Sequence, residues 1–158
     1  MPDIMLTRVD NRLIHGQVGM TWANHLRANL IIVANDEVAN DEVQQNLMDM
    51  AVSSLAETRY FTLQKTIDVI HDAGDWQHIF LVVKTPQDAL TLVEGGVPIT
   101  TLNIGNMHFK EGKKQVTSVI SVDEDDKKTI RKLIEHGVKI EIRKVPDEPL
   151  TPVEKILA

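Results

Sequence analysis

The residues best suited to chemistry lie close together near the N-terminus, within residues 9–17. His15 carries an imidazole that can act as a nucleophile and hold a phosphoryl group on one nitrogen. Arg12, three residues earlier, supplies a guanidinium that matches the oxygens of such a group. Asp10 is placed to orient Arg12 or an imidazole N–H, and Gly16 lacks a Cβ and so lets another group approach the ring. The set allows phosphoryl transfer, although this spacing alone is more often that of a structural histidine.

These residues are predicted to lie on a turn between a strand and a helix. Residues 4–9 are mainly apolar and β-branched, which predicts a short strand, and residues 17–26 repeat apolar side chains at helical spacing. In an open α/β sheet such a turn lies at the carboxyl end of its strand, where ligands bind. The free N–H groups at the start of the following helix favour an anion there.

The rest of the chain alternates predicted strands and helices, which indicates one α/β domain over residues 1–158. We expect a three-layer sandwich with a mainly parallel sheet of about seven strands, helices on both faces, and an antiparallel edge near residues 110–122. Residues 146–158 are expected to form a C-terminal tail. In the second helix, an apolar stripe is expected to face the core. Its members are Val43, Leu47, Met50 and Ala51.

The composition excludes several classes of protein. A formal net charge of −6 argues against a general nucleic-acid binder. The absence of cysteine excludes disulfides and thiol chemistry. The first residues lack the basic start and apolar run of a signal peptide, and no stretch is long enough to span a membrane. We therefore expect a cytoplasmic protein.

Common nucleotide-binding and hydrolase motifs are missing from the sequence. There is no Gly-x-x-x-x-Gly-Lys loop, no Gly-x-Gly-x-x-Gly after a predicted strand and no Gly-x-Ser-x-Gly elbow. His108 and His15 have no third ligand at a suitable spacing. We therefore expect neither a metal nor another cofactor.

The run TRVDNRLIHGQV at residues 7–18 resembles the active-site signature of the mannose/sorbose-type IIB components (EIIB) of the bacterial sugar phosphotransferase system. The similarity extends to four later blocks, in the order and spacing that the family shows. They are residues 35–39, 92–97, 103–107 and 121–123. A match in several blocks is far more specific than a single motif, and this one covers nearly the whole chain.

The resemblance implies a role for each residue of the site. His15 would accept a phosphoryl group on Nδ1 from a phosphohistidine of an EIIA protein or domain, with Arg12 stabilising the group. The sugar would arrive through the membrane subunits EIIC and EIID, so the protein would associate with the inner face of the cell membrane. We assign six further residues to phosphate binding or to orientation, with Gly105 and Asn106 in a predicted polar loop at 103–108. The six are Asp10, Gly16, Gln17, Asp36, Gly105 and Asn106.

The sugar is the least defined part of this hypothesis. Residues 33–41 and 105–109 are most similar to family members assigned to N-acetylgalactosamine or galactosamine. This similarity favours an amino sugar or a related hexose as the acceptor.

Two other functions fit parts of the sequence. In a flavodoxin-like binding or signalling module, Asp36 at a strand end would hold a cation or accept phosphate, and His15 would be structural. A structural assembly subunit would carry no phosphate at all. Acid stability separates the phosphocarrier from the binding or signalling module, because phosphohistidine is lost in acid and an acyl phosphate is lost in base.

Overall fold

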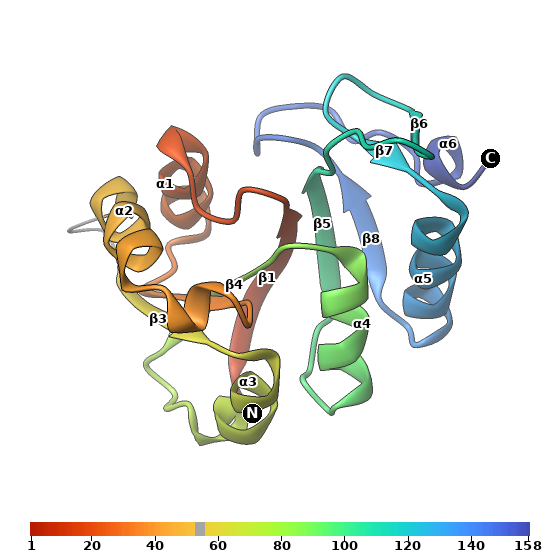
Figure 1. The fold of residues 1–158 in the computed structure, drawn as a ribbon. Helices are drawn as coiled ribbons and strands as arrows, with labels where there is room; N and C mark the ends of the chain where they lie inside the picture. The colour runs from red at the N-terminus through yellow and green to blue at the C-terminus, as the bar shows by residue number, and fades with distance from the viewer. Residues whose placement is uncertain (53–55) are drawn as a thin grey trace.

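A six-stranded sheet forms the middle layer of the protein (Figure 1). The structure is a computed structural model that describes residues 1–52 and 56–158. The strand order is β3-β2-β4-β1-β5-β8, and every neighbouring pair is parallel. The strands are β1 (Asp3–Asp10), β2 (Leu30–Ala34), β3 (Glu57–Phe61), β4 (His78–Val83), β5 (Thr101–Asn106) and β8 (Lys139–Ile142).

Helices cover both faces of this sheet, as predicted (Figure 1). Side chains alternate between the faces of a strand, so in β2 Ile31 belongs to the core on the face that α1 and α2 cover, whereas Ile32 belongs to the core on the face that α3, α4 and α5 cover. The apolar and β-branched runs of the central strands are therefore buried on both sides. The helices are α1 (Gly16–Leu26), α2 (Glu42–Val52), α3 (Leu63–Val69), α4 (Pro86–Glu94), α5 (Glu124–Glu135) and α6 (Glu154–Leu157), with short 3₁₀ turns η1 (Val38–Asn40) and η2 (Ile70–Asp72).

The antiparallel pairing lies within residues 110–122, as predicted, but it is not an edge of the main sheet. It is a separate two-stranded sheet of β6 (Lys114–Gln115) and β7 (Ser121–Val122), beside the main sheet, which has six strands instead of about seven. The residues between them form a compact turn, in which the Thr117 hydroxyl accepts hydrogen bonds from the backbone N–H groups of Val119 and Ile120. These local bonds close the turn between the two short strands.

The predicted apolar stripe of α2 was wrong for three of its four residues, whereas the fourth, Ala51, is half-buried and packs against the core. Val43, Leu47 and Met50 are 70%, 62% and 75% exposed, whereas Met48 and Val52 are buried. The helix therefore presents one apolar face to the core and a second one outward. Periodicity cannot choose between two such faces, because both repeat at helical spacing.

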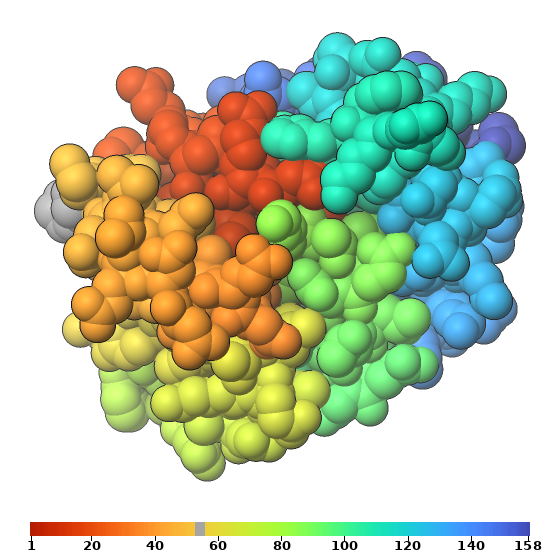
Figure 2. Space-filling model, viewed as in Figure 1, coloured from red at the N-terminus to blue at the C-terminus, as the bar shows by residue number. Residues whose placement is uncertain are grey.

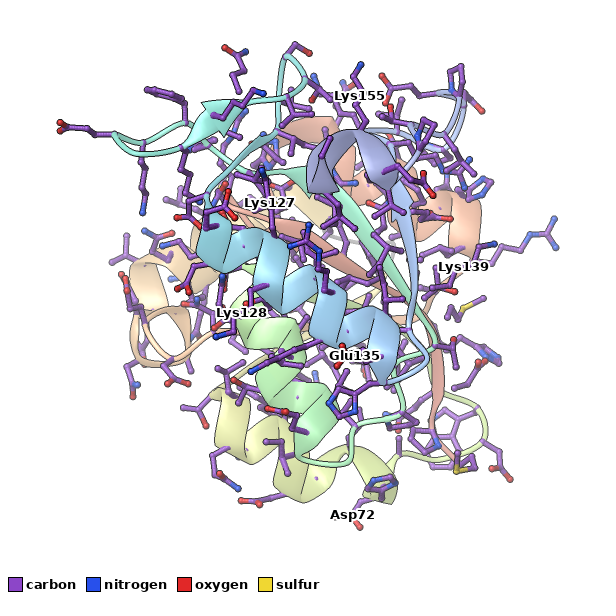
Figure 3. All side chains as sticks on the ribbon, turned by 90° about the vertical axis from the view of Figure 1, so that its right-hand side faces the viewer. Asp72, Lys127, Lys128, Glu135, Lys139 and Lys155 are labelled. Carbon is purple, nitrogen blue, oxygen red and sulfur yellow. The ribbon has the colours of Figure 1, made fainter. Side chains whose placement is uncertain are left out.

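The C-terminal residues pack on the body of the protein. Ile156 in α6 is fully buried in the core beneath α5. Two side chains of α5 hold the end of the chain, because Lys127 and Arg131 donate hydrogen bonds to the carbonyls of Ala158 and Leu157 at 2.9 Å each. Figure 3 shows Lys127 on α5 beside the helix that carries Lys155. Among the described residues, no helix is both long and apolar enough to cross a membrane.

Candidate functional site

The turn between β1 and α1 is held in shape by Asp10, at the carboxyl end of β1. Its Oδ1 accepts a hydrogen bond from the Arg12 N–H at 3.0 Å, and its carbonyl accepts one from the Leu13 N–H at 2.9 Å. Two residues of the turn adopt positive φ, Leu13 at 60° and Gly16 at 48°. Glycine adopts this conformation without strain, which explains the glycine directly after His15. The predicted strand-to-helix turn is therefore present.

His15 occupies the N-cap position of α1 in an extended conformation, and its side chain makes no capping hydrogen bond. The side chain is 24% exposed, and its Nδ1 lies 3.8 Å from Oδ2 of Asp10. Nδ1 itself is buried and has no hydrogen-bond partner among the described residues. Burial lowers the pKa of His15 and the Arg12 charge lowers it further, against the opposing effect of Asp10. The imidazole is therefore neutral near pH 7, the form that acts as a nucleophile.

A buried ion pair with Arg8 holds the carboxylate of Asp10 in place. Arg8 is 2% exposed, and its Nη2 donates to Oδ2 of Asp10 at 3.2 Å. Its Nη1 donates to Oδ1 of Asn103 in the adjacent strand β5 at 2.7 Å. Because Arg8 and Asn103 are register partners in the sheet, this contact is fixed by strand pairing. The same Oδ2 that faces His15 is thus anchored by a buried cation.

Trp22 in α1 contacts the Arg8 side chain and so joins α1 to this network. The Arg8 guanidinium lies 5.4 Å from the centre of its ring and the Arg143 guanidinium 5.5 Å from it, both within cation–π distance. The Trp22 Nε1 donates to the Lys144 carbonyl at 2.9 Å. The helix that follows His15 is therefore fixed by the same cation that holds Asp10.

Sequence reasoning missed Arg8, Trp22 and Asn103 as parts of the site. One signal was available: a charged side chain in the middle of a strand predicted to be buried requires a partner. The identity of that partner was not available, because Asn103 is 95 residues away in the sequence.

Gly105 and Asn106 lie inside strand β5, not in the predicted loop at 103–108. Gly105 makes room for Arg8, since a Cβ built on it would lie 2.1 Å from the Cζ of the guanidinium. Asn106 pairs with Asp10 in the sheet, and its carbonyl accepts from the Asn11 N–H at 3.2 Å. The structure thus brings both residues to the site, with Gly105 beneath it and Asn106 beside it.

Asp36 and Gln17 are both exposed but lie in different parts of the structure. Asp36 is exposed, and its Oδ1 accepts from the Leu63 N–H at 2.9 Å, so its carboxylate supports the start of α3. No hydrogen bond or ion pair among the described residues joins Asp36 to His15. Gln17 is exposed in the first turn of α1. The part of the chain that the structure describes also contains no cluster of acidic or histidine side chains able to hold a metal ion.

Arg12 is exposed and stands between two cavities at the carboxyl edge of the sheet. One cavity, of about 160 Å³, separates Arg12 from the segment after β5. The other, of about 310 Å³, lies toward α2 and is also lined by Lys84. A freely exposed guanidinium beside a neutral imidazole can meet a phosphoryl group carried in by another molecule.

Comparison with known proteins identifies the family. The family model described as "PTS system sorbose subfamily IIB component" matches residues 4–158. The N-acetylgalactosamine-specific phosphotransferase enzyme IIB component 2 of Escherichia coli K12 is 52% identical over 157 residues, which cover 99% of this chain and 100% of that protein. The mannose-specific EIIAB component of the same strain is 40% identical over 149 residues, 92% of this chain and 46% of that longer protein.

A solved structure agrees with this assignment. The crystal structure of the N-acetylgalactosamine-specific IIB component 1 from Escherichia coli superimposes with a TM-score of 0.93 at 46% identity, covering 96% of this chain and 99% of that one. IIB components are phosphotransferases that work with EIIA and with the membrane subunits EIIC and EIID. The chain therefore belongs to the sorbose subfamily of IIB components and is a phosphocarrier of the phosphotransferase system in sugar uptake.

Proposed function

We propose that His15 is the residue that carries the phosphoryl group, and that Arg12 stabilises the group during both transfers. The observation that carries this proposal is the neutral imidazole at the N-cap of α1, next to an exposed guanidinium. The free N–H groups at the start of α1 and the positive end of its dipole favour the phosphate dianion. Beyond this electrostatic stabilisation, the protein has mainly to hold the donor, the phosphorus and the acceptor in line.

Each transfer exchanges one bond for another. In the first, the bond from phosphorus to the histidine of EIIA breaks as a bond from phosphorus to His15 forms, and the N–H proton that His15 loses balances the imidazole nitrogen released on EIIA. In the second, the phosphorus–nitrogen bond of His15 breaks and a sugar hydroxyl oxygen takes the phosphoryl group. The hydroxyl proton balances the imidazole nitrogen that is released, so His15 returns to its neutral form. Arg12 faces the equatorial oxygens in both steps.

From the resemblance to the IIB family we infer that Nδ1 is the acceptor nitrogen, and the geometry sets a condition for this. Nδ1 is buried against Oδ2 of Asp10 at 3.8 Å, and a phosphate dianion cannot occupy that position beside a carboxylate. The ring must therefore turn about its side-chain bonds to bring Nδ1 outward before transfer. No side-chain capping hydrogen bond opposes this rotation.

We further propose that the sugar is N-acetylgalactosamine or a related amino sugar, and that the protein acts in the cytoplasm at the inner face of the membrane. The names of relatives that are 52% and 48% identical support this sugar. The EIIC and EIID partners support the location, because they deliver the sugar through the membrane.

The decisive test is to mix the protein with phosphoenolpyruvate, the general phosphotransferase proteins and an EIIA protein, then map the phosphate by mass spectrometry. We expect acid-labile phosphate on His15 alone and none on His15→Ala or His15→Gln. The variants should unfold at the same urea concentration as the wild type, because the side chain contributes little to the core. Label on Asp36, or label that survives in His15→Ala, would overturn the assignment.

A further inference from the structure

A row of polar side chains crosses three neighbouring strands on the face of the sheet that α1 covers. Arg8 in β1, Asn103 in β5 and Glu141 in β8 are register partners, so their side chains lie on the same face. Arg8 and Asn103 are buried, and the Glu141 side chain is only 11% exposed. At one end of the row, Arg8 binds Asp10, the carboxylate that faces His15. The row therefore connects the edge strand β8 with the phosphoryl carrier.

The amide of Asn103 binds its two neighbours through opposite ends. Its Oδ1 accepts from Nη1 of Arg8 at 2.7 Å. Its Nδ2 donates to Oε1 of Glu141 at 3.1 Å and to the Arg143 carbonyl at 3.3 Å. A guanidinium has only donors and an ionised carboxylate only acceptors, so a reversed amide would place a donor against Arg8 and an acceptor against Glu141. Glu141 therefore fixes which end of Asn103 faces Arg8.

The segment that follows β8 covers this row and joins it to α1. Arg143 places its guanidinium 5.5 Å from the centre of the Trp22 ring and its Nε 3.5 Å from Oε1 of Glu141. Figure 2 shows residues near 145, in blue, bordering the N-terminal part of the chain, in red, and the bond from Trp22 to the Lys144 carbonyl joins the two. Polar interactions that are shielded from water in this way are strengthened.

Glu141 can act on His15 only through the other members of the row. Among the described residues, no hydrogen bond or ion pair joins Glu141 to His15, whereas each neighbouring pair from Glu141 to Arg8 is hydrogen-bonded. Buried polar groups of this kind are expensive unless every member has a partner. A change at Glu141 is therefore expected to be felt at the far end of the row.

We propose that Glu141 is a positioning residue for phosphoryl transfer at His15. Glu141 orients the Asn103 amide, and the amide oxygen holds the guanidinium of Arg8. That guanidinium in turn fixes Oδ2 of Asp10 opposite the imidazole. This role rests on the proposed function of His15 and adds to it a part for β8, a strand at the edge of the sheet.

The protonation of His15 distinguishes this role from a plain effect of charge. After burial, which lowers the pKa of His15 most, the Asp10 charge raises it and the Arg8 charge lowers it. Glu141→Met removes the acceptor for Asn103, so the amide can reverse and displace Arg8. An NMR titration of the His15 ring should then give a pKa about 0.5 higher than in the wild type. A direct effect of the lost negative charge would instead lower this pKa.

Glu141→Gln supplies the matched comparison, because it removes the same charge but keeps an acceptor oxygen for the Asn103 amide. The pKa of His15 in this variant should stay within about 0.2 of the wild-type value. An unchanged or lower pKa in Glu141→Met, or equal values in the two variants, would overturn the proposal.

Single-turnover phosphorylation of the full-length protein by phosphorylated EIIA tests the consequence for transfer. Glu141→Met should lower the maximal rate by about fivefold and leave the EIIA concentration at half-maximal rate unchanged, and Glu141→Gln should stay within about twofold of the wild type. The control is Glu57→Met in β3, the opposite edge strand, where Glu57 also lies 3.5 Å from an arginine two residues later but both side chains are exposed. It should change neither the rate nor the titration. A changed half-saturating concentration with an unchanged maximal rate would assign Glu141 to docking and refute the proposal.

An exchange of the two groups keeps the proposal testable if a single variant is unstable. Asn103→Asp sets two carboxylates against each other and should slow phosphorylation of His15 by about tenfold. The double variant with Glu141→Gln restores a donor opposite an acceptor at the wild-type total charge, so its rate should return to within about threefold of the wild type. No recovery in the double variant would overturn the proposal. A wild type that takes up no phosphate on His15 would instead refute the proposed function, and the ring titration would still test the row.

Discussion

Nδ1 of His15 and Oδ2 of Asp10 face each other at 3.8 Å, and the same Oδ2 is held by the buried guanidinium of Arg8 at 3.2 Å. The distance between His15 and Asp10 is longer than a hydrogen bond. The carboxylate therefore acts on the imidazole mainly as a fixed charge. Its position is set by the Arg8 side chain and by the backbone of the turn.

The protonation of His15 should follow from this arrangement. Burial lowers its pKa below the ordinary value of 6.5, so the nucleophilic form should persist below pH 6.5. In the unfolded chain the histidine binds a proton more readily, so the contribution of His15 to stability should be lost as the pH falls below 6.5. NMR titration of the ring should give a midpoint under 6.5. A midpoint at or above this value would contradict the expectation.

The two charges nearest the ring should shift its pKa in opposite directions. Asp10 raises the pKa of His15 and Arg12 lowers it. The pKa of His15 should therefore fall in Asp10→Asn and rise in Arg12→Ala, as measured by the same titration. His25→Gln, at an exposed position in α1, is a suitable control and should leave the midpoint unchanged. A shift in the same direction for both variants would refute this picture of the site.

Arg12 should be sensitive to geometry as well as to charge. Arg12→Ala removes a donor to the phosphoryl oxygens and should slow phosphorylation of His15 by about 10²- to 10³-fold. Arg12→Lys keeps the charge and loses the planar fork, so its rate should lie between those of the wild type and Arg12→Ala. Rapid-quench measurement with phosphorylated EIIA gives these rates. If Arg12→Lys and Arg12→Ala both react at the wild-type rate, Arg12 has no part in the transfer.

The Arg8–Asp10 pair should behave as a coupled unit in unfolding experiments. Removing one partner leaves an unpaired buried charge, so Arg8→Met and Asp10→Asn should each lower the free energy of unfolding by about 3 kcal/mol or more. The double variant should lose less than the sum of the two, with a coupling energy of about 1–3 kcal/mol. Urea denaturation of the four proteins completes the cycle. Strict additivity would show that the ion pair is energetically unimportant.

Gly105→Ala should damage the same network from the other strand. The new Cβ would lie 2.1 Å from the Cζ of Arg8 and would displace the guanidinium from Asp10. We expect a lower melting temperature and slower phosphorylation of His15. The loss in melting temperature should be smaller when Arg8→Met is already present, because the clashing group is then absent. An equal loss in both backgrounds would place the cause elsewhere.

The two faces of α2 should differ sharply in their contribution to stability. Leu47→Ala changes a side chain that is 62% exposed and should alter the free energy of unfolding by less than about 0.5 kcal/mol. Met48→Ala changes a buried neighbour that is 5% exposed and should cost about 2–5 kcal/mol. Urea unfolding measures both. A larger loss for Leu47→Ala would mean that the outward face is buried in solution.

The sequence by itself was sufficient for the class of fold and for the turn that carries Arg12 and His15. The run of buried strands and helical repeats predicted the layered α/β architecture because both patterns are local. Polar residues between a strand and a helix predicted the turn that carries Arg12 and His15, and Gly16 has the positive φ that such a turn needs. Thr85 followed by Pro86 is also a local signal for the start of a helix, and the Thr85 hydroxyl accepts from the Asp88 N–H at the N-cap of α4.

Only the tertiary structure decided which distant groups support the site. Arg8 meets Asn103 across the β1–β5 pairing, and Trp22 bonds to the Lys144 carbonyl 122 residues away. Strand order sets these contacts, and no local pattern encodes strand order. The direction of the α2 stripe was likewise decided by packing, since burial of Met48 requires a neighbouring surface and not only a helical repeat. The fold therefore follows from local periodicity, whereas the support of His15 follows from which strands become neighbours.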